Sequence, residues 1–228
     1  MSKLIQETLI NRVDGFELSA ARVQAQGPRK GGVVVIQEIF GVTEHIREIC
    51  RFFAARGYEA LAPSLYDRIE PRFEVKGAID AQGMDKGVKA AMATPFDQVV
   101  GDVQAAIDAL RSGPIFITGF CYGGAVSWLA AARCTGLAAA SGFYGGAITR
   151  MLAQKPRVPI ILHYGAKDSH ISPSEIDKVR AAAPDVPIYM YDAGHGFCRE
   201  HSADYHEPSA TLALARTLDH FERHGAGA

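Results

Sequence analysis

Short apolar, β-branched runs alternate along the chain with amphipathic stretches, a pattern typical of βα units that build a mostly parallel sheet. The run Val33–Gln37 is almost continuously apolar, as expected for a central strand with helices on both faces. The stretch from Phe16 to Ala25 opens with apolar and polar residues in alternation and predicts an antiparallel edge strand. Further strands are predicted over residues 59–62, 115–118, 137–143, 159–164 and 187–191.

Amphipathic segments between these runs predict helices. Thr43 offers an N-cap for a helix whose apolar residues recur at helical spacing until Gly57 ends it. Further helices are predicted over residues 96–111, 123–134, 173–183 and 208–223. Without repeats or long linkers, residues 1–228 are expected to form a single α/β domain. The stretch 66–94 has weak periodicity and is either a small lid or an ordinary solvated loop and helix.

The charge balance is close to neutral, with 24 basic against 25 acidic side chains and a formal net charge of -1. No electrostatic attraction to nucleic acid or to an anionic membrane is therefore expected, and a small molecule is the expected partner. No signal-peptide pattern and no apolar run of about 18 residues is present, which predicts a cytoplasmic protein. The four cysteines lack paired CxxC spacing and are expected to be reduced.

The six residues Gly119–Gly124 lie between an apolar run and an alanine-rich helical stretch. They predict a sharp strand-to-helix turn, a nucleophile elbow, with Cys121 at its apex. Glycines suit this turn because the tight backbone leaves little space for side chains. A buried structural cysteine at a glycine-rich junction is the alternative. A nucleophile also needs a base and an acid elsewhere in the chain.

Asp168 and His195 each follow an apolar strand, and the chain order of nucleophile, acid and histidine is the one this architecture requires. The carboxyl ends of parallel strands meet at one edge of the sheet, where ligand sites form. We therefore expect His195 to act as the base and Asp168 to orient it. Asp168 closing an Asx turn, Asp192 acting as the acid and His195 capping a turn are the alternatives. His163, inside a strand, is expected to be structural.

Several residues of types that bind metals crowd into a short stretch near the end of the chain: His195, Cys198, His201, Asp204 and His206. Their spacing matches neither HExxH nor a paired-ligand zinc finger, so no metal site is predicted. Gly31 and Gly32 lack the spacings of phosphate and dinucleotide loops, and no cofactor is expected.

Four segments together resemble the dienelactone hydrolase family of α/β-hydrolases: Gln37–Gly41, Gly119–Gly124, Gly165–Asp168 and His195–Arg199. The resemblance spans nearly the whole chain and implies a single-domain α/β-hydrolase fold, with helices on both faces of a mostly parallel central sheet. It also implies that Glu38 contacts the nucleophilic thiol at rest and helps to activate it when substrate binds.

The activity implied by the resemblance is hydrolysis of a small carboxylate-bearing lactone or ester, as in carboxymethylenebutenolidase, through a thioester on Cys121. The backbone N–H groups of Ile39 and Tyr122 are expected to hold the oxyanion. Arg199 matches the family arginine that binds the substrate carboxylate, and Tyr144 is a further candidate for substrate binding. The protein is expected to be a monomer or a small homo-oligomer.

The chain departs from the family pattern in one segment. Enzymes of the family that use dienelactone carry a second arginine and a tyrosine in the segment corresponding to about residues 80–90, where this chain has neither. Lys86 and Arg68 are candidates for a replacement cation, although neither reproduces the bidentate geometry. A broad-specificity carboxylesterase is therefore an alternative function. A redox-sensing Cys121 on the same scaffold is a second alternative.

Overall fold

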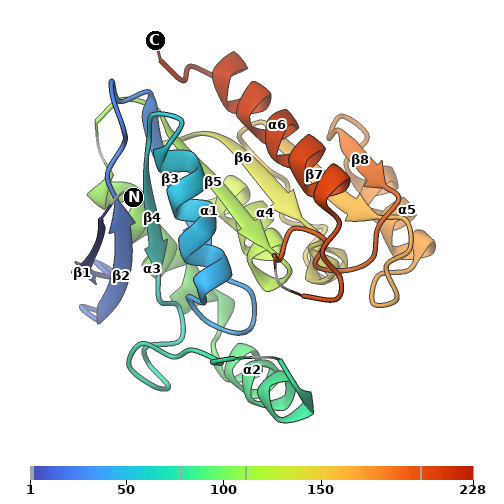
Figure 1. Ribbon diagram of the computed structural model, residues 1–228, viewed down its shortest axis with the longest axis horizontal. Coiled ribbons are helices and arrows are strands. Elements are labelled where there is room, and N and C mark those ends of the chain that lie inside the picture. Colours follow the sequence, from blue (N-terminus) through green and yellow to red (C-terminus); the bar gives the residue numbers. More distant parts are fainter. Residues whose placement is uncertain (1–2, 78, 111, 201, 228) are drawn as a thin grey trace.

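In the residues that the computed structural model describes (3–77, 79–110, 112–200 and 202–227), eight strands form one sheet in the order β1-β2-β4-β3-β5-β6-β7-β8 (Figure 1). The strands are β1 (Leu4–Ile10), β2 (Glu17–Val23), β3 (Gly31–Ile36), β4 (Tyr58–Pro63), β5 (Ile115–Phe120), β6 (Leu137–Phe143), β7 (Ile160–Gly165) and β8 (Ile188–Tyr191). The pairs from β4 to β8 are parallel, whereas β2 pairs antiparallel with both β1 and β4.

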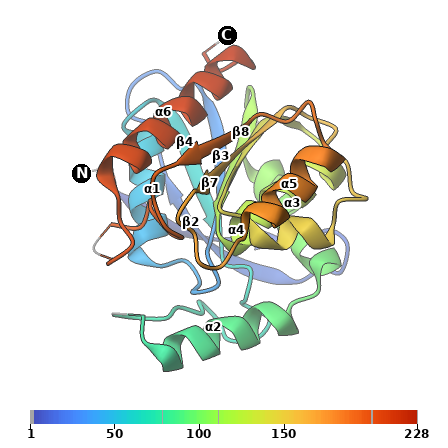
Figure 2. The same cartoon turned by 90° about the vertical axis from the view of Figure 1, so that its right-hand side faces the viewer.

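Helices cover both faces of this sheet, with α1 and α6 on one face and α3, α4 and α5 on the other (Figure 2). The helices are α1 (Glu44–Ala54), α2 (Ala81–Ala93), α3 (Phe96–Ala109), α4 (Tyr122–Arg133), α5 (Pro173–Ala182) and α6 (Glu207–Arg223), with a short 3-10 helix at Gly146–Arg150. This arrangement confirms the predicted α/β-hydrolase architecture. The predicted helix 96–111 ends at Ala109, and residue 111 lies outside the described residues.

The core lies where the fully buried central strands β3 and β5 pack between the two helical layers. On the α1 and α6 side, Phe116 of β5 stacks on Phe221 of α6 with ring centroids 4.5 Å apart, and Phe53 of α1 lies beside Phe221. Burial of each such aromatic ring stabilises the folded protein by about 3 kcal/mol. This packing ties the last helix to the centre of the sheet.

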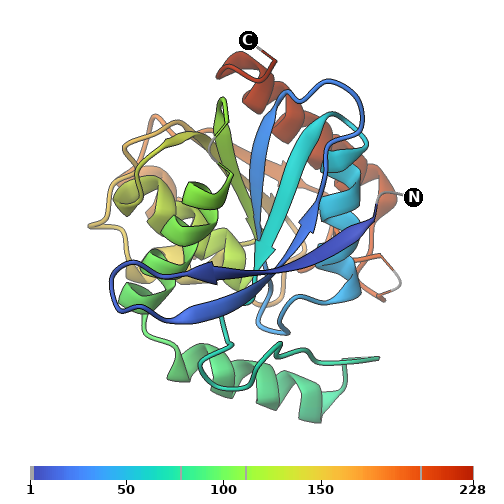
Figure 3. The ribbon, with the colours of Figure 1, turned by 90° about the vertical axis from the view of Figure 1, so that its left-hand side faces the viewer.

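The sequence prediction for residues 16–25 was right about the antiparallel pairing and wrong about the edge. Strand β1 covers β2 and forms the edge, and in Figure 3 it runs nearly across the direction of β3 and β4. In β1 only Leu9 is buried, because one of its sides has no strand neighbour and little of it packs on the core. A strand that buries so little apolar surface leaves a weak pattern in the sequence.

The parallel strands bring the ends of β3, β5, β7 and β8 to one edge of the sheet. Helix α2, part of the predicted lid stretch 66–94, lies beyond this edge in all three views (Figures 1–3). Asp80 caps α2 by accepting a hydrogen bond from the Gly83 N–H at 2.8 Å. Whether the stretch acts as a lid stays a prediction.

Candidate active site

Cys121 lies at a strained turn between β5 and α4. Its φ of 54° and ψ of -111° are unusual for a residue with a side chain. The Cys121 N–H donates to the Phe143 carbonyl oxygen at 3.0 Å, which fixes the turn on β6. A Cβ on Gly123 would lie only 2.5 Å from the Ile36 carbonyl oxygen, so glycine is required for the helix to approach the sheet this closely.

The side chains of His195 and Asp168 meet at this edge of the sheet. Nδ1 of His195 lies 2.7 Å from Oδ2 of Asp168, whose side chain is fully buried. The other oxygen of Asp168 accepts from the backbone N–H groups of His170 and Ile171, at 2.7 and 3.1 Å. Asp168 therefore closes an Asx turn and holds His195 with different oxygens, so the two sequence interpretations are compatible.

The electrostatics of this pair favour a charged imidazole. Burial opposes a charge on His195, but the hydrogen bond with Asp168 and the influence of Cys121 outweigh it and raise the pKa of His195 to about 10. Burial also works against the Asp168 carboxylate, yet the hydrogen bond from His195 and those from the two backbone N–H groups keep its pKa below the ordinary value. At neutral pH His195 therefore carries a proton and Asp168 is ionised.

The alternative acid and the remaining strand histidine lie elsewhere. Asp192 is exposed and pairs with Lys167 at 2.8 Å. His163 is fully buried in β7, with Nδ1 2.8 Å from the Tyr191 hydroxyl and Nε2 3.2 Å from the Thr217 hydroxyl. Burial lowers the pKa of His163 to about 3, so it stays neutral. His163 thus lies within the sheet, where a structural residue is expected, whereas Asp192 pairs with Lys167.

Glu38 forms a buried ion pair with Arg199. Its side chain is 1% exposed, and its Oε2 lies 3.5 Å from Nη1 of Arg199, too far for a strong hydrogen bond. Burial raises the pKa of Glu38, although the charges of Arg199 and His195 oppose this shift. Arg199 also contacts Asp204, with Nη2 3.3 Å from Oδ2. The Arg199 guanidinium therefore contacts two carboxylates, the buried Glu38 and the half-exposed Asp204.

The contact between Glu38 and the resting thiol, which the resemblance implies, stays a prediction. The ion pair that Glu38 makes among the described residues is the one with Arg199. Arg47, which lies nearer to Glu38 in the sequence, binds Glu74 at 2.7 Å. Glu38 is thus a buried carboxylate paired with Arg199.

The predicted oxyanion donors follow neighbouring strands. Ile36 and Gly119 are paired across β3 and β5, and Ile39 and Tyr122 come three residues after them. Tyr122 is the first residue of α4, so its N–H has no acceptor within the helix. Tyr144 is fully buried, and its hydroxyl makes no hydrogen bond among the described residues. Its ring lies 5.0 Å from that of His195.

The two candidate replacement cations are already engaged. Arg68 binds the buried Asp102 and the more exposed Asp14, each at 2.9 Å. Lys86 pairs with Glu70 at 2.9 Å. Neither side chain is therefore free to replace the missing family arginine. Among the described residues, Arg199 is the cation that contacts Glu38.

Two side chains near the site were missed by sequence reasoning. Tyr66 is fully buried, and its ring lies 5.6 Å from that of Tyr122. His45 is buried with its ring edge against Phe120, and burial, helped by the charge of Arg199, lowers the pKa of His45 to about 3. Tyr66 follows the end of β4 and His45 lies in the first turn of α1, positions that many residues share and that give no specific signal in the sequence.

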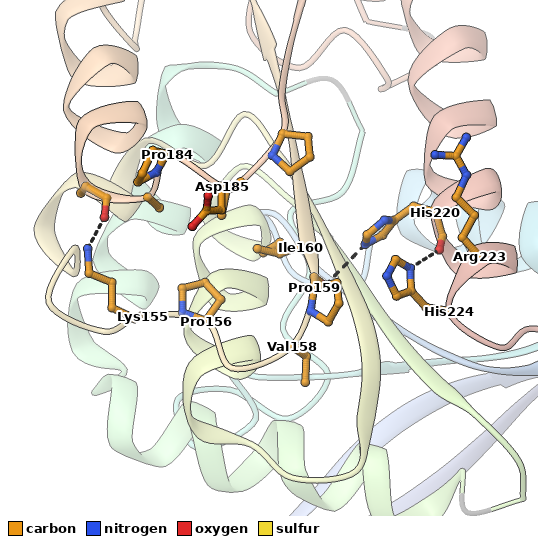
Figure 4. Close-up of a pocket in the computed structure, with 14 residues that line it drawn as sticks. Lys155, Pro156, Val158, Pro159, Ile160, Pro184, Asp185, His220, Arg223 and His224 are labelled. Atoms are coloured by element: carbon orange, nitrogen blue, oxygen red, sulfur yellow. Dashed lines mark hydrogen bonds between the residues drawn. The ribbon is translucent and has the colours of Figure 1, made fainter.

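A hollow of about 560 Å³ lies at the opposite end of the sheet, between the starts of β7 and β8 and the end of α6 (Figure 4). In it Nε2 of His220 donates to the Pro159 carbonyl at 3.4 Å, and Lys155 binds the Ala182 carbonyl. Lys155 and His220 thus bind the protein's own backbone, and the hollow lies at the end of the sheet opposite to Cys121.

The described part of the chain offers neither a metal-binding cluster nor a membrane-spanning helix. No group of three or more His, Cys, Asp or Glu side chains there is placed to hold a metal ion, and His201 lies outside the described residues. None of the described helices is both long and apolar enough to cross a membrane.

The strand order, the turn at Cys121 and the site at the carboxyl edge of the sheet define an α/β-hydrolase fold. The model of the dienelactone hydrolase family matches residues 18–225. The chain belongs to this family and is a dienelactone hydrolase-like hydrolase, as the resemblance in its sequence implies.

Known proteins are similar over most of the chain. A Yersinia pestis protein, provisionally named carboxymethylenebutenolidase, is 38% identical over 86% of this chain and 79% of its own length. A carboxymethylenebutenolidase from Pseudomonas putida is 33% identical over 82% of this chain and 83% of its own. A crystal structure of a protein provisionally named dienelactone hydrolase, from Klebsiella pneumoniae, is 31% identical with a TM-score of 0.80, covering 95% of this chain and 98% of that one.

Proposed function

We propose that this protein hydrolyses a small carboxylate-bearing lactone or ester, with Cys121 as nucleophile, His195 as acid and base, and Asp168 as its orienting acid. The observation that carries the proposal is the 2.7 Å contact between Nδ1 of His195 and Oδ2 of Asp168, at the same edge of the sheet as the strained turn of Cys121. The likeness to a carboxymethylenebutenolidase supports a lactone substrate. We also propose that the protein is located in the cytoplasm, as expected from the sequence.

The reaction begins with attack of the Cys121 thiolate on the carbonyl carbon, while the imidazolium of His195 holds the proton. The tetrahedral oxyanion accepts hydrogen bonds from the N–H groups of Ile39 and Tyr122. Each such donor typically stabilises the transition state by about 3 kcal/mol, because the oxyanion charge develops only there. The C–O bond then breaks, and His195 gives its proton to the departing enolate or alkoxide.

The second half of the reaction releases the enzyme. The neutral imidazole of His195 removes a proton from water, and the resulting hydroxide attacks the thioester carbonyl. The C–S bond breaks, which frees the acid product and returns the thiolate beside the protonated histidine. Asp168 holds the ring in one tautomer through both halves.

Arg199 and Glu38 connect substrate binding to this chemistry. A substrate carboxylate that binds Arg199 competes with Glu38 for the guanidinium. A buried Glu38 that loses this cation has a higher pKa and a greater affinity for a proton. Glu38 can then accept a proton from the thiol when Cys121 starts in its neutral form. Substrates without a carboxylate do not produce this effect.

A broad-specificity carboxylesterase is the second candidate. It is favoured by the engagement of Arg68 and Lys86 with acidic partners, so neither candidate replacement cation is free to bind a substrate carboxylate. Such an enzyme would hydrolyse neutral esters nearly as fast as anionic lactones. A redox-sensing thiol would need neither Asp168 nor His195.

The deciding experiment measures hydrolysis of a dienelactone and of 4-nitrophenyl acetate by the wild type, Cys121→Ala and Arg199→Ala. Cys134→Ala, which removes another buried cysteine, is the control. We expect Cys121→Ala to abolish both activities and Arg199→Ala to reduce mainly dienelactone hydrolysis. Hydrolysis that survives Cys121→Ala rules out the covalent mechanism. Equal losses on both substrates in Arg199→Ala remove its role as the carboxylate anchor.

A further inference from the structure

Helix α2 contacts the turn after β3 through a face made of small residues. Gly83, Gly87 and Ala90 are the buried residues of α2, whereas Met84, Val88 and Met92 are exposed. A Cβ on Gly87 would lie 2.7 Å from the carbonyl oxygen of Ile39. The helix can therefore approach this backbone only because residue 87 has no side chain.

The segment before α2 holds the same turn from a second side. The N–H of Val75 donates to the Phe40 carbonyl at 2.9 Å, and Gly41 pairs with Glu74 in an isolated β-bridge. The side chain of Glu74 binds Arg47 of α1 at 2.7 Å. Residues 39–41 are thus held by two parts of the stretch 66–94: the segment Glu74–Val75 and helix α2.

We propose that Gly87 is a positioning residue that sets the Ile39 N–H for the oxyanion, so that α2 acts as a buttress of the active site. The proposal rests on the proposed function, in which that N–H stabilises the transition state. A turn fixed on both sides keeps the peptide orientation constant, and a displacement near 1 Å can cost about 100-fold in rate. Glycine lowers the helical propensity of α2. The close contact with Ile39 explains why a glycine is nevertheless present at position 87.

Gly83 provides a matched control on the same face of α2. A Cβ there would meet a methyl group of Val75 at 2.7 Å, the end of a side chain that can move, whereas the Cβ at Gly87 meets backbone. Gly83→Ala and Gly87→Ala both replace a glycine of α2 by the residue with the highest helical propensity. Of the two added methyl groups, the one at residue 87 meets the backbone of Ile39.

The test compares kcat for ester hydrolysis with alkylation of Cys121 by iodoacetamide in the wild type and both variants. We expect Gly87→Ala to lower kcat about 10- to 100-fold with little change in KM, since the donor acts in the transition state. Alkylation forms no oxyanion and should keep its rate. Gly83→Ala should retain wild-type kcat. A Gly87→Ala enzyme with wild-type kcat, or equal losses in both variants, overturns the proposal.

The amide resonance of Ile39 in the free protein tests the geometry without turnover. It should move in Gly87→Ala and stay in place in Gly83→Ala, and the opposite result contradicts the buttress. If Gly87→Ala fails to fold, Val75→Pro loosens the turn from the other side by removing the N–H that binds Phe40, and its kcat should fall similarly. Hydrolysis that survives Cys121→Ala refutes the proposed function, while the Ile39 resonance still decides the buttress.

Discussion

Nη1 of Arg199 lies 3.5 Å from Oε2 of Glu38, a carboxylate that is almost completely buried. The two residues are far apart in the chain, and the pair forms where the turn after β3 meets the loop after β8. In the proposed function a substrate carboxylate competes with Glu38 for this guanidinium, and the 3.5 Å contact is too long for a strong hydrogen bond. This relationship has consequences for stability that do not depend on the substrate.

Removing the cation should destabilise the protein in a pH-dependent way. Arg199→Met leaves Glu38 buried without a counter-charge, and we expect a loss of about 3 kcal/mol at pH 8. Since burial already raises the folded-state pKa of Glu38, this loss should shrink as the pH falls and Glu38 gains a proton. Urea unfolding at pH 8 and pH 5 measures both values. Glu38→Gln in the same chain should restore most of the stability, and a loss unaffected by it contradicts the pairing.

Asp168 should be needed for activity, whereas Asp192 should not. Asp168→Asn keeps an oxygen for the Asx turn but disturbs the tautomer of His195, and kcat should fall about 1,000-fold. Asp192→Asn changes an exposed carboxylate paired with Lys167 and should leave kcat within a factor of two of the wild type. Steady-state kinetics on one ester suffices. Comparable losses in the two variants would assign no special role to Asp168.

The charge on His195 should stabilise the fold at neutral pH. Its folded-state pKa of about 10 exceeds the ordinary value near 6.5. The resulting stabilisation is complete below about pH 6.5 and is lost as the pH rises toward 10. We expect the wild type to lose of the order of 2 kcal/mol more than His195→Gln between pH 6.5 and pH 10. Parallel stability curves for the two proteins would show that His195 titrates normally.

The backbone strain at Cys121 should be measurable. Its positive φ costs a residue with a Cβ about 1–3 kcal/mol, and glycine avoids this cost. Cys121→Gly should therefore be more stable than Cys121→Ala by about 1 kcal/mol, and the proposed function expects both variants to be inactive. Chemical denaturation of the two variants decides the point. Equal stability would mean that the turn relaxes when the thiol is lost.

Arg68 should matter for stability and not for substrate choice. Arg68→Met removes the partner of the buried Asp102 and should lower the free energy of unfolding by about 3 kcal/mol. The ratio of kcat/KM for dienelactone over 4-nitrophenyl acetate should stay unchanged. A fall in this ratio would show that Arg68 reaches the substrate after all, and Lys86→Met provides the same measurement for the exposed Lys86.

Local sequence signals predicted much of the fold and of the site, because they depend on residues near each other in the chain. The continuous apolar run at Val33–Gln37 predicted a central strand, and glycines around Cys121 predicted its turn. Asp168 and His195 were found because they follow strands, and parallel strands bring their ends together. Strand β1 escaped prediction because it buries one side chain, so its apolar pattern is weak.

Tertiary structure alone decided which charged groups pair and which backbones touch. Nothing in the sequence shows that Arg199 binds Glu38 while Arg68 binds Asp102, because a long cationic side chain can reach several carboxylates and packing selects one. The contact of Gly87 with the Ile39 carbonyl likewise depends on where α2 comes to rest. Periodicity is a property of neighbouring residues, whereas pairing and close approach depend on the distances that folding sets between segments remote in the chain.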